Sequence, residues 1–150
     1  MKRDIITEKI KKIEEYLPNT EKYSIRLDAN ESPFLPSEEI MSEFRAALDK
    51  IEFDRYPDPY ATELVESFAK YCGIAPENVV AGNGSDEIIS LICSGFIDPG
   101  DVVTVTVPDF SMYEFYSELA GGKIDKVGKD RNLKVDIDSL IDHVRKNRSK

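Results

Sequence analysis

The feature that most constrains this chain is an unbroken run of β-branched residues, Val102-Val103-Thr104-Val105-Thr106-Val107. Residues of this type fit a pleated strand, and the run carries no charged face. A strand of this kind is typical of a parallel sheet that is covered on both sides. The sequence therefore predicts an α/β fold, with a mainly parallel sheet and flanking helices.

A glycine turn lies upstream, in the stretch Val79-Val80-Ala81-Gly82-Asn83-Gly84-Ser85-Asp86-Glu87. We expect a short strand at residues 79–81, a turn at the two glycines, and a helix with Ser85 as its N-cap. With the strand at residues 102–107 this would make a βαβ unit. A helix start presents unpaired N–H groups and so suits a phosphate, but a well-capped structural turn fits the same residues.

A second loop follows the run at residues 108–114. Ligands of parallel sheets collect beyond the carboxyl ends of the strands, so this loop and the glycine turn are candidates for one shared site. Ser111 and Glu114 have the spacing of a capping box. Tyr113 falls in the first turn of the predicted helix, where its ring could pack in the core or form a platform for a ligand.

Apolar spacing at three and four residues predicts the other helices. They are expected from residue 6 to a stop at Pro18, from Ser37, from Thr62 to Gly73, and from Asp138. Alternating patterns predict strands at residues 23–27 and 123–127. The single histidine, His143, is expected on the polar side of the last helix, and residues 145–150 are expected to form a solvated basic tail.

Composition excludes several classes of function. The 150 residues carry a net charge of −9, which argues against nucleic acid or an anionic membrane as a partner. No apolar run approaches the roughly 20 residues of a membrane span, and no signal peptide is visible, so we expect a soluble cytoplasmic protein. Cys72 and Cys93 are expected to be reduced and buried. One histidine and two separate cysteines predict no metal site and no Ser-His-acid triad.

Five motifs give the chain a specific resemblance. They are Leu27-Asp28-Ala29-Asn30-Glu31-Ser32-Pro33, Arg55-Tyr56-Pro57-Asp58-Pro59, Gly82-Asn83-Gly84-Ser85-Asp86-Glu87, Asp98-Pro99-Gly100-Asp101 and Pro108-Asp109-Phe110-Ser111-Met112-Tyr113. In this order the chain resembles, over about residues 25–145, the N-terminal part of the class II pyridoxal-phosphate-dependent aminotransferases of fold type I. Within that group it is most similar to the histidinol-phosphate aminotransferases.

The resemblance implies a fold, a cofactor and a division of the chain. The fold would be the N-terminal portion of the fold type I large domain, and the cofactor would be pyridoxal 5'-phosphate. Residues 1–35 would form an N-terminal arm or small-domain segment, and residues 36–150 the first part of the cofactor-binding large domain. Gly84, Ser85 and Asp86 would hold the cofactor phosphate, chiefly through backbone N–H groups, and Tyr113 would stack on the pyridine ring.

The resemblance also implies partners and a reaction. Tyr56 would reach the phosphate of the cofactor in a neighbouring subunit, which requires a homodimer, and Asn30 and Glu31 would lie near the substrate. The reaction would be amino transfer between L-histidinol phosphate and 2-oxoglutarate, with glutamate as the product, in histidine biosynthesis. In such enzymes the lysine that forms the Schiff base lies beyond residue 150, so no catalytic residue is assigned and the chain alone is expected to be inactive.

Other functions fit the same residues. Threonine-phosphate decarboxylases and aromatic aminotransferases share much of this half with the histidinol-phosphate enzymes. A non-catalytic α/β module that binds a phosphate ligand is an alternative from a different class, favoured by the missing Schiff-base lysine.

Overall fold

The computed structural model describes residues 5–13, 17, 20–27 and 30–150. They belong to two compact units, one made of Gly82–Lys150 with the N-terminal segment, and the other of Leu17–Ala81. The first unit contains α1 (Glu8–Lys12), α4 (Gly84–Phe96), β1 (Val102–Val107), α5 (Met112–Ala120), β2 (Lys123–Gly128) and α6 (Ile137–Asn147). The second contains α2 (Glu38–Leu48), α3 (Thr62–Cys72) and the 3-10 helix η1 (Pro76–Asn78).

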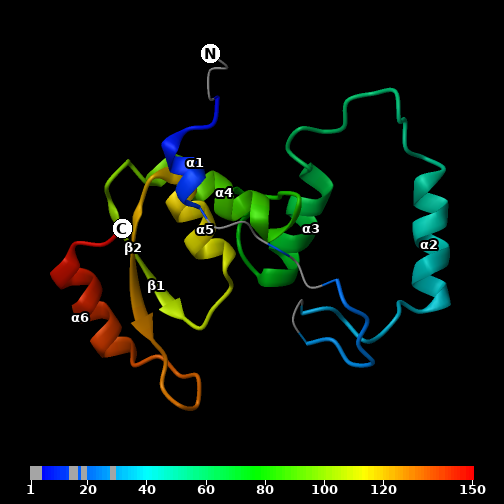
Figure 1. The fold of residues 1–150 in the computed structure, drawn as a ribbon. Coiled ribbons are helices and arrows are strands. Elements are labelled where there is room, and N and C mark those ends of the chain that lie inside the picture. The colour runs from blue at the N-terminus through cyan, green and yellow to red at the C-terminus, as the bar shows by residue number, and fades with distance from the viewer. Residues whose placement is uncertain (1–4, 14–16, 18–19, 28–29) are drawn as a thin grey trace. The chain divides into compact units, whose positions relative to one another are not determined.

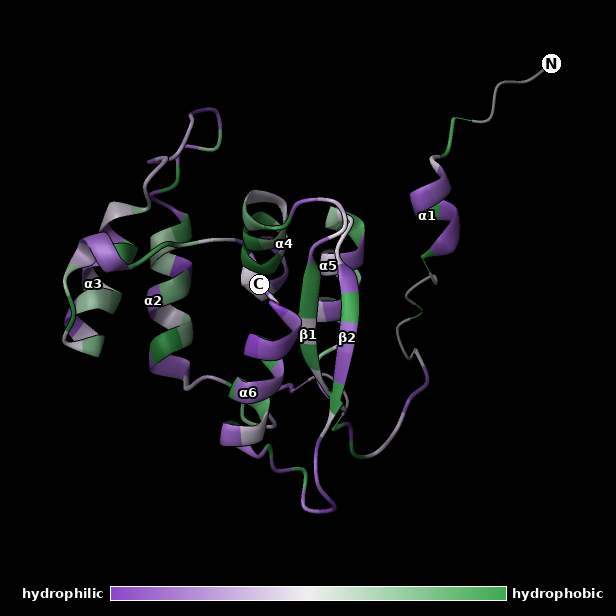
Figure 2. Ribbon diagram, turned by 90° about the vertical axis from the view of Figure 1, so that its left-hand side faces the viewer, coloured by the Kyte–Doolittle hydropathy of each residue, from purple (hydrophilic) through white to green (hydrophobic). Residues whose placement is uncertain are grey.

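A parallel pair of strands organises the first unit. β1 pairs with β2 in a register that sets Val102 opposite Lys123 and Val107 opposite Gly128, and α5 connects the two strands. α4 and α5 pack on each other, α5 contacts both strands, and α6 lies on the opposite face of the sheet (Figures 1 and 2). The structure therefore confirms the α/β class, the strand predicted at residues 102–107 and the one predicted at residues 123–127.

Two other strand predictions were wrong. Val79 has an extended backbone, with φ −122° and ψ 133°, yet residues 79–81 pair with no strand in the described part of the chain. Residues 23–27 form no strand either. An extended segment becomes a strand only when a neighbour takes its N–H and C=O groups, and a local pattern cannot report that neighbour. The βαβ unit is thus β1–α5–β2, and not the one predicted around α4.

The predicted burial of β1 on both faces was also wrong. Val105 is buried, but the other residues of β1 are only partly covered, and within the described residues the strand pairs with β2 alone. Figure 2 shows β1 as hydrophobic along most of its length, whereas β2 mixes hydrophilic and hydrophobic residues. β2 accordingly has exposed positions at Lys123, Lys126 and Gly128.

Several predicted helix ends are confirmed. Ser37 caps α2, because its hydroxyl accepts a hydrogen bond of 3.3 Å from the N–H of Ile40. α3 spans Thr62–Cys72, and Gly73 ends it with a φ of +69°, in the left-handed region that glycine tolerates. The C-terminal end of α5 at Gly121 has the same form, with a φ of +97°. The predicted stop of the first helix at Pro18 lies outside the described residues.

Other caps differ from the prediction. Asn83, not Ser85, is the N-cap of α4, and Asp136, not Asp138, caps α6 by accepting from the N–H of Ser139 at 3.2 Å. Ser111 precedes α5 but makes no capping bond, because its backbone is already helical and the predicted capping box does not form. Glu114 instead pairs with Lys126 of β2 at 2.7 Å. The two N-caps that differ are local, since Asp136 accepts from Ser139 three residues on, so the sequence placed each cap two positions from where it lies.

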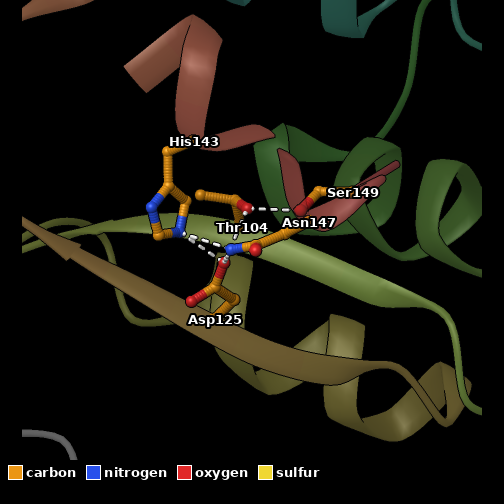
Figure 3. A network of polar contacts seen from close by, with 5 residues as sticks. All are labelled: Thr104, Asp125, His143, Asn147 and Ser149. Carbon is orange, nitrogen blue, oxygen red and sulfur yellow. Dashed lines mark hydrogen bonds and ion pairs between the residues drawn. The ribbon is translucent and has the colours of Figure 1, made fainter. Parts of the chain in front are cut away.

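A polar network fixes α6 on the sheet (Figure 3). Asp125 of β2 accepts from Asn147 at 2.7 Å and lies 2.6 Å from Nε2 of His143. The hydroxyls of Thr104 and Ser149 lie 2.6 Å apart. His143 therefore faces the sheet rather than the polar side of its helix, and the end of the chain packs along β1 instead of forming a solvated tail.

Three further observations complete the fold. Lys150 also contacts the start of β1. Its N–H donates to the carbonyl of Val102 at 3.0 Å, and its Nζ lies 2.7 Å from Asp101.

Cys93 is buried as predicted, but Cys72 is exposed, contrary to prediction. No helix in the described part of the chain is both long and apolar enough to cross a membrane.

Two glycine substitutions should change stability in opposite directions. Gly73→Ala puts a Cβ on a residue with φ +69°, so we expect a loss of about 1 kcal/mol in the free energy of unfolding. Gly95→Ala lies inside α4 with nothing within 4 Å of its Cβ, so we expect a gain of about 1 kcal/mol from helix propensity. Urea denaturation followed by circular dichroism measures both, and equal effects of the two variants would contradict the assigned cap.

Candidate functional site

The glycine turn before α4 depends on the absence of two side chains. A Cβ on Gly82 would lie 2.6 Å from Cδ1 of Ile88, so a larger residue there would require the side chain of Ile88 to move. Gly84 has a φ of +79°, and a Cβ there would meet nothing within 4 Å. The chain thus folds back tightly at Gly82 and leaves open space beside Gly84.

The turn leaves two backbone donors unused. The N–H of Asn83 donates to the Glu87 carboxylate at 2.6 Å, and that of Gly84 to the carbonyl of Gly82 at 3.0 Å. Within the described residues, the N–H groups of Ser85 and Asp86 make no bond to a group before the helix. Two free N–H groups at the positive end of a 13-residue helix form a site suited to an anion.

The loop after β1 is held by the carboxylate of Asp109. Its Oδ2 accepts from Nζ of Lys129 at 2.7 Å and from the hydroxyl of Thr106 at 2.6 Å, while its Oδ1 accepts from the N–H of Phe110 at 2.8 Å. The Lys129 ammonium, then the Thr106 hydroxyl and the Phe110 N–H, lower the pKa of Asp109 from 3.8 to about 2. Asp109 is therefore a fixed anion at neutral pH.

Tyr113 and α4 share a cavity. The cavity measures about 390 Å³ and lies between β1, α4 and α5, where Ile89, Cys93 and Tyr113 are among its lining residues. Tyr113 is 45% exposed, and its ring meets Phe110 edge-on, with centroids 5.8 Å apart and an interplanar angle of 89°. The ring is thus half-covered and partly open to a ligand.

The structure brings together only some of the predicted site residues. Gly84, Ser85 and Asp86 begin the helix that walls the cavity of Tyr113, but they are not among the residues that line it. The remaining three belong to the other unit. There Asn30 has a φ of +52°, Glu31 is exposed, and the fully exposed Tyr56 borders a hollow of about 500 Å³ together with Arg55 and Pro57.

Comparison with protein families identifies the family to which the chain belongs. Residues 22–150 match the model of aminotransferase class I and II. The chain belongs to this family. The resemblance found in its motifs is thereby confirmed, and family membership indicates pyridoxal 5'-phosphate as the cofactor.

Individual relatives agree with the family match. The chain is 37% identical over 150 residues to the histidinol-phosphate aminotransferase of Clostridium novyi, and covers 100% of its own length and 42% of that relative. The crystal structure of the histidinol-phosphate aminotransferase from Sinorhizobium meliloti, in complex with pyridoxal-5'-phosphate, has a TM-score of 0.82 at 22% identity, over 98% of this chain and 41% of that one. This likeness confirms the fold type I architecture.

A second solved structure extends the comparison to another aminotransferase. The aspartate aminotransferase from Thermotoga maritima is 31% identical, with a TM-score of 0.67, over 79% of this chain and 34% of that one. The chain thus spans between about a third and about two fifths of the length of these relatives and solved structures.

The residues present fit the cofactor of this family. Its phosphate is an anion, and the two free N–H groups at Ser85 and Asp86 are donors of the kind that phosphates bind. Its pyridine ring is flat and aromatic, and the half-covered ring of Tyr113 offers a surface of matching shape. The first unit therefore carries donors of the kind that would bind the phosphate and an aromatic face of the kind that would cover the ring.

Sequence reasoning missed the role of Asp109 and Lys129. Asp109 lies in one of the five motifs, but the motif indicates no partner for it, and Lys129 lies in none of them. A signal was available, since Asp109 follows β1 and Lys129 follows β2. The carboxyl ends of adjacent parallel strands lie at the same edge of a sheet, so opposite charges just beyond them are natural partners.

The lowered pKa of Asp109 predicts how the ion pair responds to acid. Because folding lowers this pKa, the carboxylate adds to the free energy of unfolding above pH 4, and this contribution is lost as the pH falls from about 4 to about 2. Lys129→Met should move the pKa of Asp109 back toward 3.8. Carboxyl carbon chemical shifts followed by NMR against pH measure this.

The control for this titration is Asp136. Its pKa is lowered by the hydroxyl and the N–H of Ser139, which do not involve Lys129. The Lys129→Met variant should therefore leave the titration of Asp136 unchanged. An unchanged pKa of Asp109 in that variant would contradict the ion pair.

Proposed function

We propose that this chain forms the N-terminal part of a histidinol-phosphate aminotransferase and supplies part of its pyridoxal 5'-phosphate site. Support comes from the name of curated relatives that cover nearly the whole chain, among them the Clostridium novyi enzyme at 37% identity. The observation that carries the proposal is the pair of free N–H groups at Ser85 and Asp86, on a helix that shares a cavity with Tyr113.

Each of these residues has a defined task in the proposed site. The N–H groups of Ser85 and Asp86 bind the phosphate of the cofactor, and the flexible Gly84 allows that phosphate to approach the main chain. Tyr113 covers one face of the pyridine ring. When bound, the cofactor supplies the electron sink that amino transfer requires. The apolar residues Ile89 and Ile92 line the cavity of Tyr113 and give it an apolar wall.

The other unit completes the proposal. Tyr56 is proposed to contact the phosphate of the cofactor in a second subunit of a homodimer, and its fully exposed side chain leaves it free to do so. Asn30 and Glu31 are proposed to lie near the substrate, histidinol phosphate or glutamate. Residues 1–35 would act as an arm or small-domain segment, and residues 36–150 as the first part of the large domain.

The proposal extends to the activity of the isolated chain. Residues 1–150 include no lysine in a context that matches the Schiff-base motif, so we expect them to bind the cofactor without amino transfer. The acidic composition and the two free cysteines support a cytoplasmic location.

A proline substitution tests the phosphate-binding role of the main chain. Ser85→Pro removes one N–H donor, and proline is tolerated in the first turn of a helix. We expect about tenfold weaker binding of pyridoxal 5'-phosphate, the cost of losing one hydrogen bond to a charged group. Titration of the chain followed by tyrosine fluorescence measures the affinity.

The matched control is Ser85→Ala, which keeps the N–H and should change the affinity less than about twofold. Circular dichroism of both variants verifies that α4 is retained. If the alanine variant binds as weakly as the proline variant, the hydroxyl and not the main chain holds the ligand.

Substrate choice is tested on the full-length protein that contains these residues. Rates of amino transfer or decarboxylation with histidinol phosphate, phenylalanine and threonine phosphate are compared as kcat/KM. We expect histidinol phosphate to exceed the others by at least about 100-fold, because a site built for an anion and an imidazole loses several contacts with either analogue. A preference for phenylalanine or threonine phosphate would assign the protein to one of the related enzymes instead.

A further inference from the structure

We infer that Asp109 and Lys129 are positioning residues that hold the ring of Tyr113 in place for the cofactor. The two side chains form a clamp, defined here as the Asp109–Lys129 ion pair with its hydrogen bonds. The inference rests on the proposed function for one point only, that Tyr113 covers the pyridine ring.

The clamp joins the ends of two strands. Lys129 directly follows β2, and its backbone N–H donates to the carbonyl of Val107, the last residue of β1, at 2.8 Å. Its side chain then reaches the carboxylate of Asp109 at 2.7 Å. The side chain of Lys129 is 17% exposed, so this ion pair is better shielded from solvent than an ordinary surface pair.

Both oxygens of the Asp109 carboxylate already accept hydrogen bonds. One oxygen accepts from Lys129 and Thr106, and the other accepts from the N–H of Phe110. These donors come from β1, from the loop after it and from the residue after β2. Asp109 therefore fixes the path of the loop, and its negative charge is neutralised by Lys129 at the edge where an anionic cofactor would approach.

The path from the clamp to Tyr113 is short. Asp109 holds the N–H of Phe110, and the carbonyl of Phe110 accepts from the N–H of Tyr113 at 3.2 Å. The ring of Phe110 also meets that of Tyr113 edge-on at 5.8 Å. Asp109 and Tyr113 line the same cavity of about 390 Å³. Releasing the carboxylate would therefore loosen the loop that carries both aromatic rings.

A double-mutant cycle tests the clamp. Asp109→Asn, Lys129→Met and the double variant of the chain are titrated with pyridoxal 5'-phosphate and, separately, with inorganic phosphate. Each single variant should bind pyridoxal 5'-phosphate about three- to tenfold more weakly, and the double variant should lose little more, because the two residues act as one unit. Affinity for inorganic phosphate should change less than about twofold, since phosphate needs only the N–H groups of α4.

Two controls separate positioning from general destabilisation. Asp101→Asn breaks a comparable ion pair, with Lys150 at 2.7 Å, next to the opposite end of β1, and should leave both affinities unchanged. In a Tyr113→Ala background the Asp109→Asn change should have no further effect on pyridoxal 5'-phosphate. NMR signals of the Tyr113 ring should shift and broaden in Asp109→Asn and in Lys129→Met, but not in Asp101→Asn.

The outcomes distinguish this inference from the proposed function. If the unchanged chain binds pyridoxal 5'-phosphate and the clamp variants bind it equally well, the clamp is overturned and the proposed function stands. An equal loss of affinity for both ligands also overturns it, because the clamp would then act on the phosphate end. If the unchanged chain binds neither ligand, the proposed cofactor site is rejected. The proposed role of the clamp in cofactor binding is then rejected as well. If the NMR signals of the Tyr113 ring are unchanged in Asp109→Asn and in Lys129→Met, the clamp does not position the ring and the inference is overturned.

Discussion

The parallel pairing of β1 with β2 is the interaction on which the first unit depends. Its register sets Val107 opposite Gly128, so both strands end at one edge, and the residues that follow them are brought within bonding distance. The ion pair of Asp109 with Lys129 forms there, and the helix that carries Tyr113 begins there. The opposite face of the same pair receives α6 through Asp125 (Figure 3). Loss of this pairing would therefore move apart the loop of Asp109 and the residues that follow β2.

The candidate site combines main-chain groups for the phosphate with an aromatic side chain for the ring. These two kinds of group place different demands on the sequence. As proposed, the phosphate end would rely on main-chain N–H groups, which any residue except proline provides, so the requirement would fall on Gly82 and Gly84, which shape the turn. The ring end would rely on a side chain, Tyr113, whose position must be set by its neighbours. Main-chain binding tolerates side-chain change, whereas a stacked ring does not. This difference explains why polar contacts concentrate around the loop of Tyr113 and not around Ser85.

Much of the fold followed from local chemistry. The run at residues 102–107, the cap at Ser37 and the stop at Gly73 were predicted, because each depends on residues within a few positions of one another. What failed depends on distant partners. Residues 79–81 look like a strand but have no neighbour to pair with among the described residues, and His143 lies on a polar stripe whose partner, Asp125, is 18 positions away. The Asp109–Lys129 pair was missed for the same reason, since it is 20 positions apart and is created by the sheet register.

The small number of buried apolar residues limits the stability that each unit can have by itself. Among the described residues only Ala69, Cys93, Val105 and Met112 are buried apolar residues, while Leu27, Phe34 and Tyr56 are at least four fifths exposed. Exposed apolar surface on this scale is typical of faces that an assembled protein covers. The polar contacts of the first unit do not replace such cover, because each intramolecular hydrogen bond adds only about 1 kcal/mol net. The clamp at the carboxyl edge therefore fixes geometry more than it adds stability, which is the property that a positioning device for an aromatic ring requires.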